Sequence, residues 1–261
     1  MKFKNLVYAV DGPIATIRLS RVSRRNALNA ELKIELTQAL RQFQDDGSVA
    51  SGVLTGEGEV FCAGGDIGEF TELAGKTGPE IVEAARLSAE PHRTGLGLTK
   101  PLVAAVNGPA LGSGFGLVAF CPFAVAAEHA TFGITPIRLG VVPLPVMPAA
   151  IRALGYRKAL QLCLTAEVID AHEALRMGLV DQVVPAADVM LRALTVARRL
   201  AEQSPMAVRG AMEAFHDLAG RTQDDVFDQV VLRMVPYYQT EDLREGCKAF
   251  LEKRAARWTG R

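Results

Sequence analysis

One glycine-rich stretch constrains this chain more than any other: residues 100–116, Lys-Pro-Leu-Val-Ala-Ala-Val-Asn-Gly-Pro-Ala-Leu-Gly-Ser-Gly-Phe-Gly. Leu102–Val106 is an apolar run long enough for a buried strand and too short for an independent helix. Asn107-Gly108-Pro109 ends that run, and the glycines that follow lead into a second apolar run, Leu117–Phe120. A strand, a glycine turn and a helix start in this order point free backbone N–H groups outward at the positive end of a helix dipole. Such a turn can hold an anion, or an oxygen that becomes anionic during a reaction, although close backbone packing explains the glycines equally well.

A second corner of the same kind lies earlier in the chain. Val53–Gly56 is typical of a strand that runs into a turn, and Phe61–Ile67, Phe-Cys-Ala-Gly-Gly-Asp-Ile, of another strand-to-helix corner. Phosphate-binding patterns do not fit residues 100–116, because no Gly-Lys-Ser/Thr closes the turn and no G-x-G-x-x-G occurs. The sequence therefore predicts two clusters of backbone N–H groups at two helix starts.

Together the two corners resemble those of the enoyl-CoA hydratase/isomerase (crotonase) superfamily. Further segments fit that family's pattern in order: Arg-Asn-Ala-Leu-Asn at 25–29, Phe-Gly and Leu-Gly at 132–133 and 139–140, Leu-Thr through Gly-Leu-Val at 164–180, and Glu-Gly through Phe-Leu-Glu-Lys at 245–253. These matches extend over nearly the whole chain. No single segment is decisive, but the ordered set is highly specific.

The composition is that of a protein with a large core and no preference for polyanions. The chain has 261 residues, 49% of them hydrophobic, which suits one large domain or a domain with an appendage. Lys plus Arg and Asp plus Glu both number 29, so no nucleic-acid-binding face is expected. The four cysteines lack C-x-x-C spacing, and neither a secretory signal nor an 18-residue apolar run occurs. These features favour free thiols, a cytoplasmic location, no membrane span and no metal site.

Local patterns predict the order of helices and strands. Leu6–Val10 and Ile14–Leu19 flank Asp11-Gly12, the signature of a hairpin, and Asn29 is a good N-cap for a helix over Ala30–Phe43. Further strands are predicted at 49–55, 102–106, 124–127, 131–132 and 179–184, and further helices from 66 and 79 and over 148–154, 158–164 and 171–177. Because proline interrupts helical hydrogen bonding, Pro91 is expected to kink or end the helix that begins at residue 79.

Strand-and-helix units continue to about residue 190, and everything beyond Ala187 is helical by pattern, which predicts an α/β core with a helical appendage. The alternation also suits a doubly wound sheet. The resemblance implies instead a spiral core of stacked ββα turns over residues 1–190 and a helical C-terminal region, 191–261, that packs subunits into trimers and dimers of trimers. Apolar residues of that region, among them Leu218, Phe227 and Val231, exceed what a small appendage can hide. A homotrimer or hexamer is therefore expected.

The resemblance also implies a ligand: an acyl-CoA thioester, with coenzyme A as part of the substrate and no other cofactor. Two backbone N–H groups would hold the thioester carbonyl oxygen, and by position these would be Ala63 and Ser113. Fixed donors of this kind stabilise an enolate oxygen by roughly 3–4 kcal/mol each. The residues that fall where the family contacts CoA or the acyl group are Arg24, Ala27, Leu28, Gly64, Gly65, Asp66, Ile67, Gly112 and Thr135. Phe250 and Lys253 resemble residues that a neighbouring subunit lends to the CoA cleft.

The chain departs from the family at its two catalytic glutamates. By position, Gly116 stands where the first would be and Pro136 where the second would be, and neither residue can transfer a proton. Hydration needs an acid and a base, so ordinary hydration by the family mechanism is not expected. Glu69 and His92 are possible substitute bases near the acyl pocket, although a surface or capping role is the commoner one for such residues.

Three hypotheses on function remain open. A decarboxylase fits the residues best, because loss of carbon dioxide next to a thioester leaves an enolate and needs no carboxylate base. A non-catalytic acyl-CoA-binding or scaffold protein would explain the loss of both glutamates equally well. The third hypothesis is a hydratase or isomerase that uses an unrecognised base such as Glu69 or His92.

Overall fold

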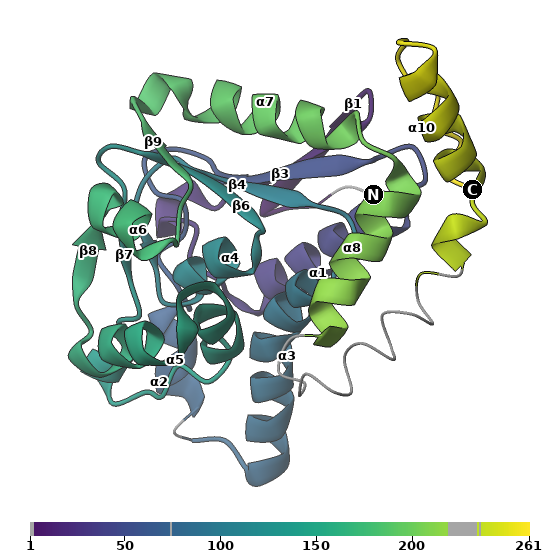
Figure 1. Ribbon diagram of the computed structural model, residues 1–261. Coiled ribbons are helices and arrows are strands. Elements are labelled where there is room, and N and C mark those ends of the chain that lie inside the picture. Colours follow the sequence, from purple (N-terminus) through teal and green to yellow (C-terminus); the bar gives the residue numbers. More distant parts are fainter. Residues whose placement is uncertain (1–2, 74, 219–233, 235) are drawn as a thin grey trace.

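A six-stranded sheet organises the computed structural model, which describes residues 3–73, 75–218, 234 and 236–261 (Figure 1). The strands lie in the order β1-β2-β3-β4-β6-β9, with bounds Leu6–Asp11, Ile14–Leu19, Ser51–Gly56, Leu102–Val106, Phe123–Ala127 and Gln182–Val184. β1 and β2 form the predicted antiparallel hairpin, whose turn contains Gly12 at φ +55°, and every later pair is parallel. Parallel strands require crossover connections, and these carry the helices and the corners identified from the sequence.

A second, three-stranded sheet supports the region after the glycine-rich turn. It contains β5 (Ala110–Leu111), β7 (Thr131–Gly133) and β8 (Val168–Asp170), with β5 parallel to β7 and β7 antiparallel to β8. The short strand β5 leads directly into α4 (Ser113–Phe120), so this sheet fixes where that helix begins.

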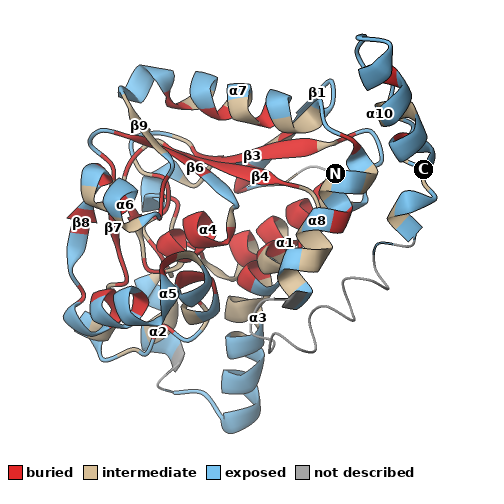
Figure 2. Ribbon diagram, viewed as in Figure 1, coloured by how far each residue is buried: buried red, intermediate tan, exposed pale blue. Residues whose placement is uncertain are grey.

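Helices cover both faces of the large sheet. α7 (Val189–Ala201) packs on one face, over β3, β4 and β6, while α1 (Ala30–Asp45), α3 (Gly78–Leu96) and α4 lie on the other (Figure 1). The apolar stripe expected for α1 is buried, and so is nearly the whole of α4 (Figure 2). Gly95 allows α3 to approach α4 closely, because a Cβ atom there would lie 2.6 Å from the Phe120 ring.

The remaining elements form the rim of the core and the C-terminal region. They are η1 (Val22–Arg24), α2 (Ile67–Leu73), η2 (Pro136–Leu139), α5 (Met147–Thr165), α6 (Ala171–Met177), η3 (Ala186–Asp188), α8 (Pro205–Leu218) and α10 (Glu241–Leu251). Among the described residues, no helix combines the length and the apolar character needed to cross a bilayer.

Two sequence predictions on helices had different outcomes. The two helices predicted on either side of residue 155 are confirmed, because Gly155 interrupts α5 with φ +74° and ψ 163°. Of the two outcomes expected at Pro91, a kink or an end of the helix, the end does not occur, since α3 continues through Pro91 to Leu96. Packing against α1 and α4 holds the helix together there and outweighs the one hydrogen bond that proline cannot make.

The expected boundary between core and appendage falls inside a packed helix. Residue 190 lies in α7, and Ser51 in β3 donates a hydrogen bond of 2.7 Å to the carbonyl oxygen of Ala197. α7 is therefore continuous with the core, and the helices after it carry the C-terminal region. Phe227 and Val231, on which the oligomer prediction partly rests, lie outside the described residues, as does the side chain of Leu218.

Candidate active site

The two corners predicted from the sequence lie against each other and are joined through their backbones. The N–H of Cys62 donates to the carbonyl oxygen of Pro109 at 3.1 Å, and the N–H of Leu111 donates to Cys62 at 2.9 Å. A Cβ atom on Gly114 would lie 2.2 Å from the Cys62 carbonyl oxygen, so only glycine fits at this crossing. The relative position of the two helix starts is thus fixed by contacts between main-chain atoms.

The structure corrects one of the two expected N–H donors. The N–H of Ala63 donates to the carbonyl oxygen of Arg25 at 3.0 Å, so it is used within the fold. Leu28 forms an isolated parallel bridge with Gly65, in which Leu28 accepts from Asp66 at 3.1 Å and donates to Gly64 at 2.7 Å. Gly65 is the central residue of this bridge, so its own N–H and C=O groups point away from Leu28. The N–H of Gly65, two residues after Ala63, is therefore not used in the bridge.

The second expected donor is placed as predicted, at a helix start. Ser113 is the first residue of α4, where backbone N–H groups have no partner within the helix. Within the described part of the chain, neither Gly65 nor Ser113 uses its N–H in a hydrogen bond, and both residues are half-buried. Gly64, at φ +106°, packs against the backbone of the second corner, because a Cβ atom there would be 3.0 Å from the Leu111 carbonyl oxygen.

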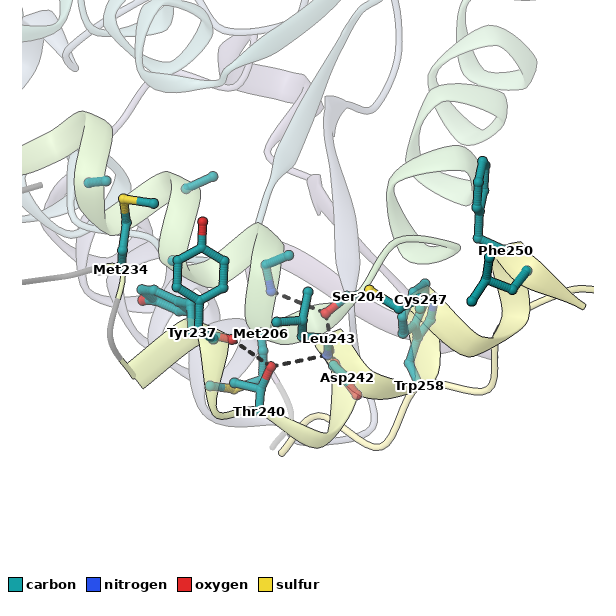
Figure 3. A pocket seen from close by; sticks show the side chains of 17 residues that line it. Ser204, Met206, Met234, Tyr237, Thr240, Asp242, Leu243, Cys247, Phe250 and Trp258 are labelled. Carbon is teal, nitrogen blue, oxygen red and sulfur yellow. Dashed lines mark hydrogen bonds between the residues drawn. The ribbon is translucent and has the colours of Figure 1, made fainter. Parts of the chain in front are cut away.

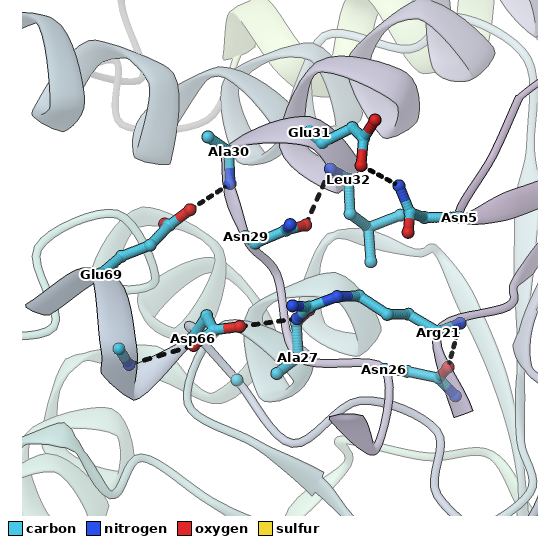
Figure 4. Close-up of polar contacts among 12 residues, drawn as sticks. Asn5, Arg21, Asn26, Ala27, Asn29, Ala30, Glu31, Leu32, Asp66 and Glu69 are labelled. Carbon is cyan, nitrogen blue, oxygen red and sulfur yellow. Dashed lines mark hydrogen bonds and ion pairs between the residues drawn. The ribbon is translucent and has the colours of Figure 1, made fainter. Parts of the chain in front are cut away.

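A polar clamp holds the first corner from the side of η1 (Figure 4). Arg21 donates to the carboxylate of Asp66 at 2.7 Å and to the carbonyl oxygen of Ala27 at 3.0 Å. This hydrogen bond from Arg21 is the main reason why the pKa of Asp66 lies below its usual range. Asp66 also accepts from the N–H of Gly68 at 3.0 Å and thereby caps α2. Sequence reasoning missed Arg21, because nothing in its neighbourhood in the chain indicates a partner 45 residues away.

Asn26 anchors the same clamp and was contained in the Arg-Asn-Ala-Leu-Asn motif without a stated role. Asn26 is fully buried, and its backbone has a left-handed φ of +55°. Its side-chain amide donates to the carbonyl oxygens of Glu57 and Val60 at 3.0 and 2.7 Å. Its side-chain oxygen accepts from the backbone of Arg21 at 2.9 Å. The motif therefore carries a structural residue that connects η1 to the segment before the first corner.

The residues expected to contact CoA gather around this corner, with different exposures. Arg24 is exposed at the end of η1 and contributes to the lowered pKa of Asp66 through its charge. Ile67 is 61% exposed, whereas the side chain of Leu28 is buried in the core, so only its backbone is available at the bridge. Gly112 and Thr135 lie at the second corner, at the start of α4 and of η2.

Glu69 is not available as a substitute base, because both of its carboxylate oxygens are already paired. One accepts from Lys33 at 2.7 Å and the other from the N–H of Ala30, the first residue of α1 (Figure 4). Glu69 therefore neutralises a mostly buried lysine and caps α1. The sequence could not show that both oxygens of this carboxylate already accept hydrogen bonds.

The two positions at which the family resemblance implies catalytic glutamates both border the glycine turn. Gly116 lies three residues after Ser113 on the buried helix α4. Pro136 opens η2, and its Cγ atom would be 3.5 Å from a Cβ atom on Gly112. Neither position offers a titratable group, so the second corner carries no carboxylate at either place.

His92 fills the space in front of Gly116. A Cβ atom on Gly116 would lie 2.6 Å from Cε1 and 2.9 Å from Nδ1 of this imidazole. His92 is 2% exposed, packs edge-on against Phe120 with 6.4 Å between ring centroids, and has no hydrogen-bond partner for either ring nitrogen within the described structure. Burial alone lowers the pKa of His92 to about 4, so the ring is neutral near pH 7. Sequence reasoning named His92 as a candidate base without being able to place it against residue 116.

Other candidates have structural surroundings. The thiol of Cys62 is fully buried and its pKa is raised by burial to about 12, which excludes it as a thiolate nucleophile near neutral pH. Phe250 lies near the end of α10 and Lys253 two residues beyond that helix, on the opposite side of the structure from α2 (Figure 1). Within one chain they are therefore not brought to the site. Among the described side chains, no three His, Cys, Asp or Glu residues lie close enough together to hold a metal ion.

Comparison with known proteins agrees with this arrangement. A family model described as enoyl-CoA hydratase/isomerase matches residues 10–261. The mevalonyl-coenzyme A hydratase of Aspergillus fumigatus is 32% identical over 251 residues, covering 94% of this chain and 91% of the fungal protein. The 2,3-dehydroadipyl-CoA hydratase of Escherichia coli is 34% identical, and that match covers 95% of this chain and 96% of the bacterial protein.

The fold is shared with solved structures as well. The crystal structure of an enoyl-CoA hydratase from Bacillus anthracis superposes with a TM-score of 0.91 at 31% identity, covering 99% of this chain and all of the other. The sheet, the two joined corners and the C-terminal helices are thus those of the α/β crotonase fold. The chain belongs to the enoyl-CoA hydratase/isomerase (crotonase) superfamily.

Proposed function

We propose that this protein binds an acyl-CoA thioester and stabilises its enolate in an oxyanion hole made by the N–H groups of Gly65 and Ser113. The observation that carries the proposal is the presence of two unused N–H groups on corners that are held together by main-chain contacts. Donors fixed in advance require no reorganisation when charge develops on the carbonyl oxygen, and each is worth roughly 3–4 kcal/mol. Gly65 replaces Ala63 in this role, because the N–H of Ala63 is already used.

The reaction that fits the missing carboxylates best is decarboxylation of an acyl-CoA that carries a carboxylate on its α-carbon. The bond between the α-carbon and the carboxylate breaks, its electron pair moves into the thioester to form the enolate, and carbon dioxide leaves. The enolate then takes up one proton at the α-carbon. Neither Gly116 nor Pro136 is needed for the bond-breaking step, and no oxidant or further cofactor takes part. The hydrations named for relatives need an acid and a base at the double bond, which these two positions do not supply.

The remaining site residues are proposed to hold the CoA part of the ligand. Arg24 is exposed next to the first corner, where a guanidinium can meet CoA phosphates, and Ile67 offers apolar surface beside it. The backbone around the two corners would border the thioester and the acyl group, through Ala27, Leu28, Gly64, Asp66, Gly112 and Thr135.

A homotrimer or hexamer is part of the proposal, because the C-terminal region exposes apolar side chains. α8 and α10 border a cavity of about 840 Å³ lined mainly by apolar residues, among them Met206, Leu243 and Trp258 (Figure 3). Phe250 and Leu251 at the end of α10 are 83% and 80% exposed. A neighbouring subunit would cover this surface, and Phe250 and Lys253 of one subunit would then lie at the CoA site of the next. The four free thiols suit a cytoplasmic location.

A protein that binds acyl-CoA without turnover is the second candidate, because the loss of both carboxylates also suits it. Calorimetry with acetyl-CoA and methylmalonyl-CoA would test binding, and detection of released carbon dioxide or of propionyl-CoA would test turnover. The proposed enzyme binds both thioesters and decarboxylates the second one. Binding without any product supports the non-catalytic protein, and absence of binding refutes both.

A matched pair of variants tests the oxyanion hole itself. Gly65→Pro removes one of the two N–H groups and is expected to lower turnover about 10²–10³-fold. Ala63→Pro removes an N–H that donates to Arg25 and should disturb folding of the corner instead. A protein with Gly65→Pro that folds and retains full turnover would refute the assignment of Gly65.

A further inference from the structure

One buried side chain is left without a role by the proposed function. His92 lies on α3, the second long helix under the sheet, yet its ring reaches α4 at Gly116. The ring atoms Cε1 and Nδ1 occupy the volume into which any side chain at residue 116 would extend, at 2.6 and 2.9 Å from its Cβ position. The glycine at this position is therefore required by the imidazole, and the two residues form one unit.

The surroundings of this imidazole are apolar on each element that packs against it. Phe120 on α4 meets the ring edge-on, and Val146, just before α5, lies 3.3 Å from the same Cβ position of Gly116 that the ring approaches. On α3 itself, the carboxylate of Glu90 accepts from Arg93 and from Arg41 of α1, and burial alone shifts the pKa of His92. Neither imidazole nitrogen has a partner within the described structure. A neutral imidazole has one donor and one acceptor, and a buried pair of this kind without partners is uncommon unless a ligand completes it.

The distance along α4 places the ring close to the proposed oxyanion hole. Gly116 follows Ser113 by three residues, which corresponds to a rise of about 4.5 Å along the helix. A carbonyl oxygen bound to Ser113 lies about 3 Å from that N–H, and the α-carbon is two bonds further on. A group in front of Gly116 is therefore within reach of the α-carbon of a bound thioester.

We propose that His92 is a catalytic residue that moves a proton to and from the α-carbon of the bound acyl group, in the place of a carboxylate at residue 116. In the forward step the unprotonated ring nitrogen takes the α-proton, the C–H electron pair forms the enolate, and the N–H groups of Gly65 and Ser113 hold its oxygen. The imidazolium then returns the proton to carbon. When the enolate arises by loss of carbon dioxide, the neutral ring first takes up one proton from solvent as negative charge develops beside it. The imidazolium then delivers that proton to the α-carbon and returns to the neutral imidazole.

Electrostatics favour this cycle once the substrate is bound. Burial keeps the imidazole neutral in the empty protein, which leaves a nitrogen lone pair free to accept a proton. An enolate forming next to the ring carries negative charge, and an opposite charge within a few ångströms favours the protonated form. The ring thus gains basicity when the reaction develops charge.

Exchange of the α-protons in D2O tests this inference, which rests on the proposed acyl-CoA function. Of acetyl-, propionyl- and butyryl-CoA, the thioester that binds most tightly by calorimetry is incubated with the protein, and deuterium uptake is measured by mass spectrometry. His92→Gln keeps a polar side chain of similar length but cannot accept a proton from carbon. It should lower the exchange rate 10²–10⁴-fold and change the Kd less than about threefold. His129→Gln, at an exposed histidine, is the control and should exchange as the wild type does.

Chemical rescue separates a base from a packing group if His92→Gln does not fold. In His92→Ala, added imidazole should restore at least a tenth of the exchange rate, and pyrazole, a ring of the same size and much lower basicity, should not. Equal rescue by both rings, or wild-type exchange in His92→Gln, overturns the role of His92. A wild type that binds and decarboxylates thioesters without any exchange also overturns it and leaves the proposed function intact. Absence of thioester binding refutes the proposed function, and the inference falls with it.

Discussion

Gly116→Ala should destabilise the protein only while His92 is present. The substitution adds a single methyl group at the point where α4 faces the imidazole. That methyl carbon would lie 2.6 Å from Cε1 and 2.9 Å from Nδ1, whereas ordinary contacts between such atoms begin near 3.4 Å. Either the ring or the helix must therefore move by more than half an ångström in a buried, fully packed region.

Two opposing contributions determine how much Gly116→Ala changes the free energy of unfolding. Overpacking of a core by an added methyl group costs about 1–3 kcal/mol. Replacing glycine by alanine inside a helix stabilises it by about 0.8–1 kcal/mol. Gly116→Ala in the wild type should therefore lower the free energy of unfolding by up to about 2 kcal/mol. In a protein that already carries His92→Ala the ring is gone, and the same substitution should raise that free energy by about 1 kcal/mol.

Urea unfolding at pH 7.5 of the wild type, both single variants and the double variant measures this difference as a coupling free energy. We expect a coupling of about 1–3 kcal/mol between residues 92 and 116, because they touch. The reasoning is refuted if Gly116→Ala changes the free energy of unfolding by the same amount in both backgrounds, within about 0.5 kcal/mol. That result would mean that the imidazole does not stand in front of Gly116.

Three further outcomes follow from the contacts described above. The pKa of His92 is about 4 in the folded protein and 6.5 when unfolded, so its contribution to stability is complete above pH 6.5 and is lost as the pH falls toward 4. Between pH 7 and 5 the wild type should lose about 2 kcal/mol more of its free energy of unfolding than His92→Gln, and parallel urea curves for the two proteins would contradict this. Arg21→Ala should lower the free energy of unfolding by about 1–3 kcal/mol, because it removes the partner of Asp66 in a mostly buried pair. Arg18→Ala is the control and should lower it by less than about 0.5 kcal/mol, since its partner Glu57 is 4.0 Å away and the pair is largely exposed. Equal losses in urea unfolding would refute the role of Arg21 in holding the first corner. Leu251→Glu places a charge on the exposed apolar end of α10 and should shift the protein toward monomers in light scattering. Val82→Glu, at an exposed valine of α3, is the control and should not. A trimer that persists with Leu251→Glu would contradict an interface at the end of α10.

Much of the fold could be predicted because its signals are local. The hairpin at Asp11-Gly12, the Asn29 cap of α1 and the break at Gly155 each depend on residues adjacent in the chain. The family resemblance supplied the order of the layers, which no periodicity in the sequence contains. An end of the helix at Pro91 was one of two expected outcomes, and it does not occur because α3 packs against α1 and α4, a long-range effect that a local rule for proline does not include.

The site was harder to predict, because its decisive facts are about pairing across the chain. The sequence identified two strand-to-helix corners but not which N–H groups the fold already uses: the N–H of Ala63 donates to Arg25, whereas that of Gly65 donates to no described residue. Glu69 and His92 were equal candidates as bases in the sequence. Only the fold shows that Lys33 and α1 pair with the carboxylate of Glu69, while the imidazole of His92, next to Gly116, has no hydrogen-bond partner among the residues that the structure describes.

The crossing of the two corners at Gly114 and Cys62 has a consequence for how this protein tolerates mutation. Because main-chain contacts join the two corners, exchanging side chains that face the proposed acyl site should leave the proposed oxyanion hole in place. Residues 92, 116 and 136 come from three different elements, but residues 92 and 116 fill one space and must be varied together. Selection experiments that randomise residues 92 and 116 jointly should therefore yield more folded proteins than randomising residue 116 alone, whereas randomising Gly114 should yield almost none.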